Sequence, residues 1–233
     1  MIFSIDATSR RSPNFDARRG PITALVIHSD EGTEASSLGW LCNPASQVSS
    51  GYYVARTGRI YQLVDDTDQA WHAGVSSYLG QTNFNRISLG IEVEHKQGQG
   101  AYPAVQLDAL AWLCREKIRQ YGISLAWVVA HRWIAQPPGR KIDPTDWSDR
   151  DLRPWIAALY SPTDSFAAWG AIGTPTGAAQ QYAVPQLWLK TPWLGRCLAA
   201  EDYTKSDVWS LTVFTGGVIV YDTAANLAKA YRA

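Results

Sequence analysis

Cysteine is scarce in this chain of 233 residues, which holds only Cys42, Cys114 and Cys197. Their odd number and wide spacing fit neither a disulfide framework nor a pair of closely spaced metal-binding thiols. Cys114 falls within an apolar run of helical character, where packing accounts for it. We therefore expect three buried thiols that take no part in chemistry.

An excess of charge of either sign is also absent, because Lys and Arg together number 21, as do Asp and Glu. A neutral chain exerts little long-range attraction on nucleic acid or on an anionic membrane surface. Apolar runs of about 18 residues, the length that spans a bilayer, are missing as well. We expect neither a nucleic-acid partner nor a membrane partner.

The composition that remains is that of a folded protein, with 46% apolar and 18% charged residues. The length suits one domain of roughly 150 residues and a smaller companion. Near residues 161–164 the sequence turns to Ser, Pro, Gly and Ala, which is typical of a linker. We predict a first domain over residues 1–162 and a small second domain over residues 163–233.

Hydrophobic periodicity predicts the elements of both domains. Short β-branched runs indicate strands, and apolar residues spaced by three or four indicate helices. In the first domain we predict strands over 22–27, 52–64 (a hairpin), 87–94 and 127–130, and helices over 102–121 and 149–160. In the second we predict a hairpin of strands over 208–214 and 218–221, then a helix over 223–233.

Polar side chains stand at the ends of these predicted core strands. His28 and His131 each follow an apolar run, although a lone histidine in such a place is more often structural than a metal ligand. Glu92 and Glu94 alternate with apolar residues, so the pattern places both carboxylates on one face of a strand. Two acids on a largely apolar strand indicate a function.

Several ordered motifs between roughly residues 12 and 160 resemble the zinc amidases of the peptidoglycan-recognition fold. That family includes bacterial muramoyl-alanine amidases, phage lysins and animal recognition proteins. The matching segments are SPNFDAR at 12–18, VIH at 26–28, VS at 48–49 with Tyr52, GRIYQLV at 58–64, AWHAG at 70–74, SLGIE at 88–92, AH at 130–131 and GRKIDP at 139–144.

The resemblance implies an α/β fold, in which helices flank a mixed central β-sheet, followed here by a small C-terminal α+β domain. It also implies that His28, His131 and Asp143 bind a zinc ion. Two imidazoles and one carboxylate leave the fourth tetrahedral position open, as catalytic zinc sites do. We expect Zn²⁺ as the cofactor.

The same resemblance assigns catalytic and substrate-binding roles. Glu92 is the expected general base, although Glu94 lies two residues on and points the same way. Lys141 is expected to stabilise the oxyanion of the tetrahedral intermediate. Substrate contacts are expected from a further three residues of the matching motifs, namely Tyr52, Trp71 and His72. His95 has no counterpart in the family, and we expect it on the surface.

These assignments predict an N-acetylmuramoyl-L-alanine amidase that acts as a monomer on peptidoglycan or muropeptides. The alternative is a protein of the same fold that binds peptidoglycan without cutting it, and the presence of Asp143 favours the enzyme. The N-terminus lacks the pattern of an export signal. We therefore expect a protein that is cytoplasmic at synthesis, and that either is released to the wall like a phage lysin or acts on cytoplasmic muropeptides. The second domain is expected to bind cell wall.

Overall fold

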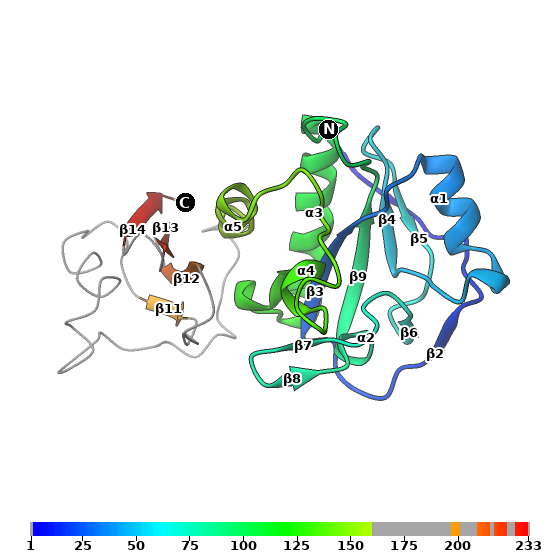
Figure 1. The fold of residues 1–233 in the computed structure, drawn as a ribbon, viewed down its shortest axis with the longest axis horizontal. Helices are drawn as coiled ribbons and strands as arrows, with labels where there is room; N and C mark the ends of the chain where they lie inside the picture. Colours follow the sequence, from blue (N-terminus) through cyan, green and yellow to red (C-terminus); the bar gives the residue numbers. More distant parts are fainter. Residues whose placement is uncertain (1, 160–196, 201–208, 215–216, 223–226, 233) are drawn as a thin grey trace. The chain divides into compact units, whose positions relative to one another are not determined.

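A computed structural model describes residues 2–159, 197–200, 209–214, 217–222 and 227–232 (Figure 1). The chain divides into two compact units. The first comprises Met1–Ile123 and Trp127–Trp147, and the second comprises Ser124–Ala126 and Ser148–Ala233. The boundary predicted between residues 162 and 163 lies outside the described residues and stays a prediction.

The first unit is built on a six-stranded sheet with the order β1-β5-β4-β9-β3-β10. Only the pairing of β4 with β5 is antiparallel, and the other four pairings are parallel. The strands are β1 (Ile5–Asp6), β3 (Ala24–Ser29), β4 (Tyr52–Val54), β5 (Ile60–Gln62), β9 (Ser88–Val93) and β10 (Val128–Ala130). The four predicted strand regions of the first domain are thereby confirmed, as is the mixed sheet.

Helices cover both faces of this sheet, and the alternation of side chains along β4 shows how (Figure 1). Tyr53 packs in a cluster with Leu38 and Leu41 of α1 (Glu34–Leu41). Its neighbour Tyr52 points to the other face, where the ammonium of Lys117 in α3 (Ala104–Tyr121) lies 4.9 Å from the ring centroid. The sheet is therefore a middle layer between α1 and α3.

Helix α3 confirms the helix predicted over 102–121. Its apolar positions face the core, and it ends at Gly122, whose left-handed φ of 65° suits glycine. The remaining elements between the N-terminus and Ile134 are short. They are β2 (Phe15–Ala17), β6 (Asp68–Ala70), β7 (Ser77–Tyr78), β8 (Gln81–Thr82), α2 (Phe84–Ile87), α4 (His131–Ile134) and the 3₁₀ turns Pro44–Ser46 and Leu125–Trp127. No described helix is long and apolar enough to cross a membrane.

Register places the polar ends of the strands side by side. In the parallel ladder His28 of β3 pairs with Glu92 of β9, and Glu92 pairs with Tyr53 of β4. Ala130 pairs with Ile27, so His131 follows in line with His28. Because in-register neighbours point to the same face, the histidines and Glu92 meet at the carboxyl edge of the sheet, on the side of α1.

The second unit contains α5 (Asp149–Ala157), which confirms the helix predicted over 149–160, and a four-stranded antiparallel sheet. The strands are β11 (Cys197–Ala200), β12 (Trp209–Phe214), β13 (Gly217–Asp222) and β14 (Leu227–Arg232). Strands β12 and β13 confirm the predicted hairpin. The helix predicted over 223–233 is wrong at 227–232, where all six residues pair with β13. This ladder overrides the helix propensity of Leu, Ala and Lys.

Two further predictions about single residues need correction. His95 does not lie on the surface: it is fully buried, stacks on Tyr102 at 4.0 Å and bonds Asp146 through Nε2 at 2.9 Å. Cys114 is buried in α3 as expected, whereas Cys42 at the end of α1 is only half-buried. His95 was misplaced because its partners lie in other segments of the chain.

Candidate active site

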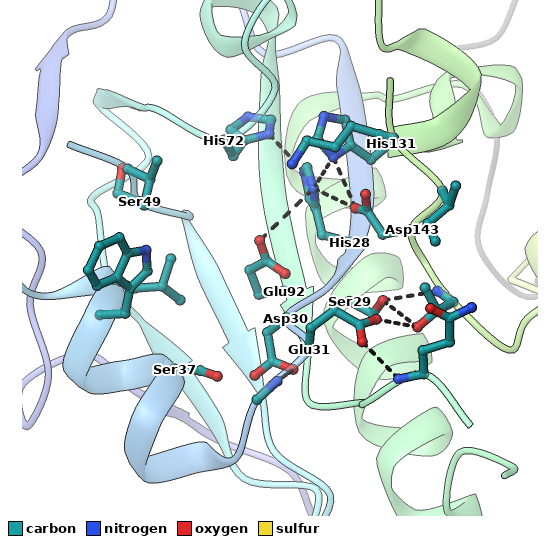
Figure 2. A pocket seen from close by; sticks show the side chains of 18 of the residues that line it. His28, Ser29, Asp30, Glu31, Ser37, Ser49, His72, Glu92, His131 and Asp143 are labelled. Atoms are coloured by element: carbon teal, nitrogen blue, oxygen red, sulfur yellow. Dashed lines mark hydrogen bonds and ion pairs between the residues drawn. The ribbon is translucent and has the colours of Figure 1, made fainter. Parts of the chain in front are cut away.

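A cavity of about 780 Å³ opens at the carboxyl edge of the central sheet. Figure 2 shows it between α1 on one side and the segment that carries Asp143 on the other. Side chains from β3, β9 and the start of α4 form its floor. The cavity lies where parallel sheets commonly bind ligands, at the carboxyl ends of their strands.

Three donor atoms converge on the floor of this cavity (Figure 2). Nδ1 of His28 lies 3.0 Å from Nδ1 of His131 and 3.2 Å from Oδ2 of Asp143. Nδ1 of His131 lies 3.0 Å from the same carboxylate oxygen. All three residues are at most 8% exposed. The structure thus brings together the three residues that the sequence predicted as metal ligands.

The pKa values of His28 and Asp143 both lie below their ordinary values, for different physical reasons. Burial, followed by the charge of His131, lowers the pKa of His28 to about 4. Burial also tends to raise the pKa of Asp143, but its close contacts with His131 and His28 outweigh burial and hold that pKa below its usual range. At neutral pH the triad therefore holds an ionised carboxylate beside a neutral His28, the protonation states that metal binding requires.

Glu92 stands beside the triad without being part of it. Its Oε1 lies 4.0 Å from Nδ1 of His28, and its side chain is 15% exposed. Oε2 is buried and has no hydrogen-bond partner among the described residues. Burial, and then the nearby charges of Asp143 and Asp30, raise the pKa of Glu92 well above its ordinary value. A carboxyl group in this setting holds a proton more readily near neutral pH.

Glu94, the alternative acid, is engaged elsewhere. Strand β9 ends at Val93, and the carboxylate of Glu94 accepts the backbone N–H groups of Glu34 at 2.9 Å and Arg56 at 2.8 Å. It does not line the cavity. One of its oxygens holds the first turn of α1 and the other holds the turn after β4, so the geometry favours Glu92 as the reactive carboxylate.

Two basic side chains border the cavity on the segment before Asp143. Lys141 is exposed and lines it, and its positive charge opposes the upward pKa shift that burial and acidic neighbours impose on Glu92. The guanidinium of Arg140 is held by backbone carbonyls, with Ala73 at 3.0 Å and Val75 at 2.9 Å. Lys141 is therefore the adaptable cation of the pair, and Arg140 the fixed one.

Of the three residues predicted to contact the substrate, two line the cavity and one does not. His72 and Trp71 both line the cavity, and the indole Nε1–H of Trp71 donates to Asp16 at 2.8 Å. Burial and the neighbouring His28 lower the pKa of His72. Tyr52 is fully buried on the α3 face, where its hydroxyl donates to Asp66 at 2.7 Å. Its assignment as a substrate contact is wrong, because alternation along β4 turns it away from the cavity.

The sequence did not reveal the apolar rim of the cavity. Trp40, Val48 and Ile142 line it while exposing 57%, 37% and 59% of their surface. Trp40 comes from α1, a helix that the sequence pattern did not predict. Exposed large apolar side chains gathered at one opening are typical of a ligand-binding surface. Because the sequence pattern did not predict α1, it gave no signal that Trp40 is exposed at this rim.

Residues 18–146 match a protein family described as N-acetylmuramoyl-L-alanine amidase. The chain is 38% identical over 138 residues to N-acetylmuramoyl-L-alanine amidase AmiD of Escherichia coli, which covers 53% of this chain and 49% of AmiD. It is 30% identical over 176 residues to 1,6-anhydro-N-acetylmuramyl-L-alanine amidase AmpD of Haemophilus influenzae, which covers 62% of this chain and 88% of AmpD. The chain thus spans about half the length of AmiD.

A solved structure supports the same relationship. The complex of AmiD from E. coli with the substrate anhydro-N-acetylmuramic acid-L-Ala-D-γ-Glu-L-Lys superposes with a TM-score of 0.51 at 32% sequence identity. The match covers 74% of this chain and 72% of that one. The architecture expected from the sequence, a mixed sheet flanked by helices, is thereby confirmed.

Proposed function

Because the chain belongs to the N-acetylmuramoyl-L-alanine amidase family, we propose that it hydrolyses the amide bond between N-acetylmuramic acid and L-alanine in peptidoglycan or its muropeptide fragments. The observation that carries the proposal is the convergence of His28, His131 and Asp143 on the floor of a cavity that Glu92 also lines. A binding protein of this fold has no need of such a set of ligands next to a buried carboxylate. Hydrolysis accounts for both features.

The donor set fits zinc. Two histidine nitrogens and one carboxylate oxygen are the ligands that catalytic zinc sites use, with the fourth position open. In a tetrahedral site with bonds of about 2.0–2.1 Å, ligand atoms lie about 3.3 Å apart. The three separations in the structure are 3.0, 3.0 and 3.2 Å, so the triad needs only a slight expansion to hold the ion. Bound there, zinc supplies an acidified water molecule and polarises the scissile carbonyl.

Glu92 is the proton carrier in this proposal. Its partnerless oxygen and its raised pKa allow it to take a proton from the attacking water near neutral pH. The water oxygen then bonds to the carbonyl carbon of the lactyl group. Glu92 passes the proton to the amide nitrogen as the C–N bond breaks, which leaves a lactyl carboxylate and a free amino group on L-alanine.

Lys141 stabilises the negative charge that develops during the reaction. A tetrahedral intermediate places negative charge on the former carbonyl oxygen, and a fixed or nearby cation stabilises it more than it stabilises the neutral amide. Lys141 lines the cavity and influences the pKa of both Glu92 and His28 through its charge, so it lies within electrostatic reach of the reacting atoms. Arg140 is already bound to backbone carbonyls and cannot take this role.

The cavity suits a sugar-linked peptide. Its volume of about 780 Å³ falls in the usual range for small-ligand sites, about 300–1,000 Å³. Trp40 and Trp71 offer aromatic faces at the opening, and such faces stack on sugar rings. The related AmiD binds an anhydromuramyl tripeptide in its solved complex. We assign the same class of ligand to this cavity.

Product analysis tests which bond is cut. The protein is incubated with an anhydromuramyl tripeptide, and the products are identified by mass spectrometry. Cleavage at the lactyl carbonyl gives free anhydromuramic acid and a peptide with L-alanine at its N-terminus. Release of a single amino acid, or a change in the sugar alone, would show a different hydrolase. Tight binding without any product would support the recognition protein instead.

A further inference from the structure

A backbone carbonyl group determines which ring nitrogen of His131 carries the proton. Nε2 of His131 lies 3.2 Å from the carbonyl oxygen of Ala73. A carbonyl oxygen only accepts hydrogen bonds, so Nε2 must carry the proton and donate. In the neutral ring this leaves a lone pair on Nδ1, the atom that points at Asp143.

A longer chain of hydrogen bonds determines which ring nitrogen of His28 carries the proton. The hydroxyl of Ser88 donates to the carbonyl oxygen of Phe84 at 2.5 Å, so its oxygen is free to accept from Nε2–H of His72 at 3.3 Å. Nδ1 of His72 then carries a lone pair and accepts from Nε2–H of His28 at 3.0 Å. His28 is left with its lone pair on Nδ1, beside that of His131.

These two chains of hydrogen bonds start from adjacent residues, His72 and Ala73, and the structure fixes both. Oδ1 of Asn85 accepts the backbone N–H groups of His72 at 3.0 Å and of Ala73 at 2.7 Å. The ring of His72 packs against Gly90 of β9 so closely that a Cβ at that position would lie 2.4 Å from its Cγ. The absence of a side chain at Gly90 therefore provides the space that the ring occupies.

From this arrangement we infer that His72 and Ala73 form a positioning clamp, which holds both metal-binding histidines with Nδ1 deprotonated and aimed at the third ligand. His72 is not itself a ligand in this arrangement, because it contacts the Nε2 side of His28, opposite the converging donors. Outer partners of this kind fix the tautomer and orientation of a ligating imidazole. The inference rests on the proposed zinc site.

Substitutions at His72 separate positioning from packing. His72→Asn keeps a side-chain acceptor close to the place of Nδ1, whereas His72→Leu keeps the bulk and removes the acceptor. The affinity for Zn²⁺ alone is measured by competition with a chelator of known affinity, and folding is checked by circular dichroism. We expect His72→Leu to bind zinc about 10–100-fold more weakly, and His72→Asn to bind nearly as tightly as the unaltered protein.

The spectrum of the Co²⁺-substituted protein adds a readout that a purely structural role would not move. The visible bands of Co²⁺ report ligand geometry, so His72→Leu should alter them and His72→Asn should preserve them. Equal zinc affinity in all three proteins, or equal weakening in both variants, would overturn the clamp.

Gly90→Ala perturbs the clamp without altering any of its polar groups. Its methyl group must displace the His72 ring, so we expect weaker zinc binding in the presence of His72. In the His72→Ala background the space is empty, and Gly90→Ala should cost no further affinity. An equal loss in both backgrounds would show damage to β9 and would contradict the clamp. If the unaltered protein binds no zinc, the proposed metal site itself fails, whereas zinc binding that is indifferent to His72 refutes only the clamp.

Discussion

Acid should destabilise the metal-free protein between pH 6.5 and pH 4. The pKa shift of His28 gives the size of the expected loss in the free energy of unfolding. The folded structure lowers the pKa of His28 from 6.5 to about 4, and the residue is 2% exposed. A lowered pKa means that the unfolded chain binds the proton more tightly, so this stability is present above pH 6.5 and lost as pH falls toward 4. At about 1.4 kcal/mol per pKa unit, His28 alone accounts for a loss of about 3 kcal/mol.

The lowered pKa of His72 adds to the loss of stability in acid, whereas Asp143 and Glu92 titrate in a different range or direction. The lowered pKa of Asp143 gives stability that is present above its ordinary pKa of 3.8 and is lost only at lower pH. The raised pKa of Glu92 gives stability that is complete below 4.5 and lost as pH rises through the folded value, so it opposes the trend. The contribution of His28 must therefore be isolated by comparison with a variant.

The assay is urea unfolding in the presence of a chelator at pH 7, 5.5 and 4, for the unaltered protein and His28→Gln. Glutamine does not titrate. From pH 7 to pH 4 the free energy of unfolding of His28→Gln should therefore fall by about 3 kcal/mol less than that of the unaltered protein. Zinc in place of the chelator should widen the difference, because it binds only the neutral imidazole and the glutamine variant lacks that ligand. Parallel pH profiles for the two metal-free proteins would refute the reasoning.

The remaining predictions concern catalysis and the second domain. Glu92→Gln should fold and retain zinc but lower kcat by about 10²–10⁴-fold, as expected for loss of a general base; near-normal turnover would remove Glu92 from the reaction. Lys141→Ala should lower kcat with little change in KM, since its charge acts on the transition state; an effect on KM alone would contradict an oxyanion role. Deletion of residues 164–233 should reduce binding to sedimented cell walls more than cleavage of a soluble muropeptide, and unchanged sedimentation would argue against a wall-binding domain.

The central strands and the two histidines at their ends were predictable because their signals are local, whereas their role as metal ligands came from the family resemblance. The run before His28 is β-branched and apolar, and His131 follows a similar run, so both histidines were expected at strand ends. Parallel pairing then brings such ends to one edge. The choice of Asp143 as the third ligand came from family resemblance, since nothing in its own neighbourhood marks it as a ligand.

The features that were missed depend on contacts between distant segments. The alternation of side chains along the strand placed Glu94 on the same face as Glu92. In the structure, however, its carboxylate accepts hydrogen bonds from the backbone N–H groups of Glu34 and Arg56. His95 follows an acidic strand and looked exposed, but Tyr102 and Asp146 bury it. Sequence periodicity reports on one segment at a time, and these partners come from others.

Helix α1 and strand β14 illustrate the same limit. The only buried apolar side chains of α1 are Leu38 and Leu41, too few for a clear helical period, although the helix supplies Trp40 to the cavity. In β14 the residues favour helix, and pairing with β13 decides otherwise. Tyr52 was predicted to contact the substrate because it belongs to a matching motif, but its side chain faces α3.

A titration of the chelator-treated protein with Zn²⁺ shows whether the triad holds a catalytic metal, when release of L-alanine-terminated peptide from an anhydromuramyl tripeptide is measured at each step. The triad of His28, His131 and Asp143 predicts that activity is absent without metal and rises linearly to a plateau at one zinc per chain. Activity that survives complete removal of the metal would contradict the account, as would one bound zinc per chain without release of the peptide.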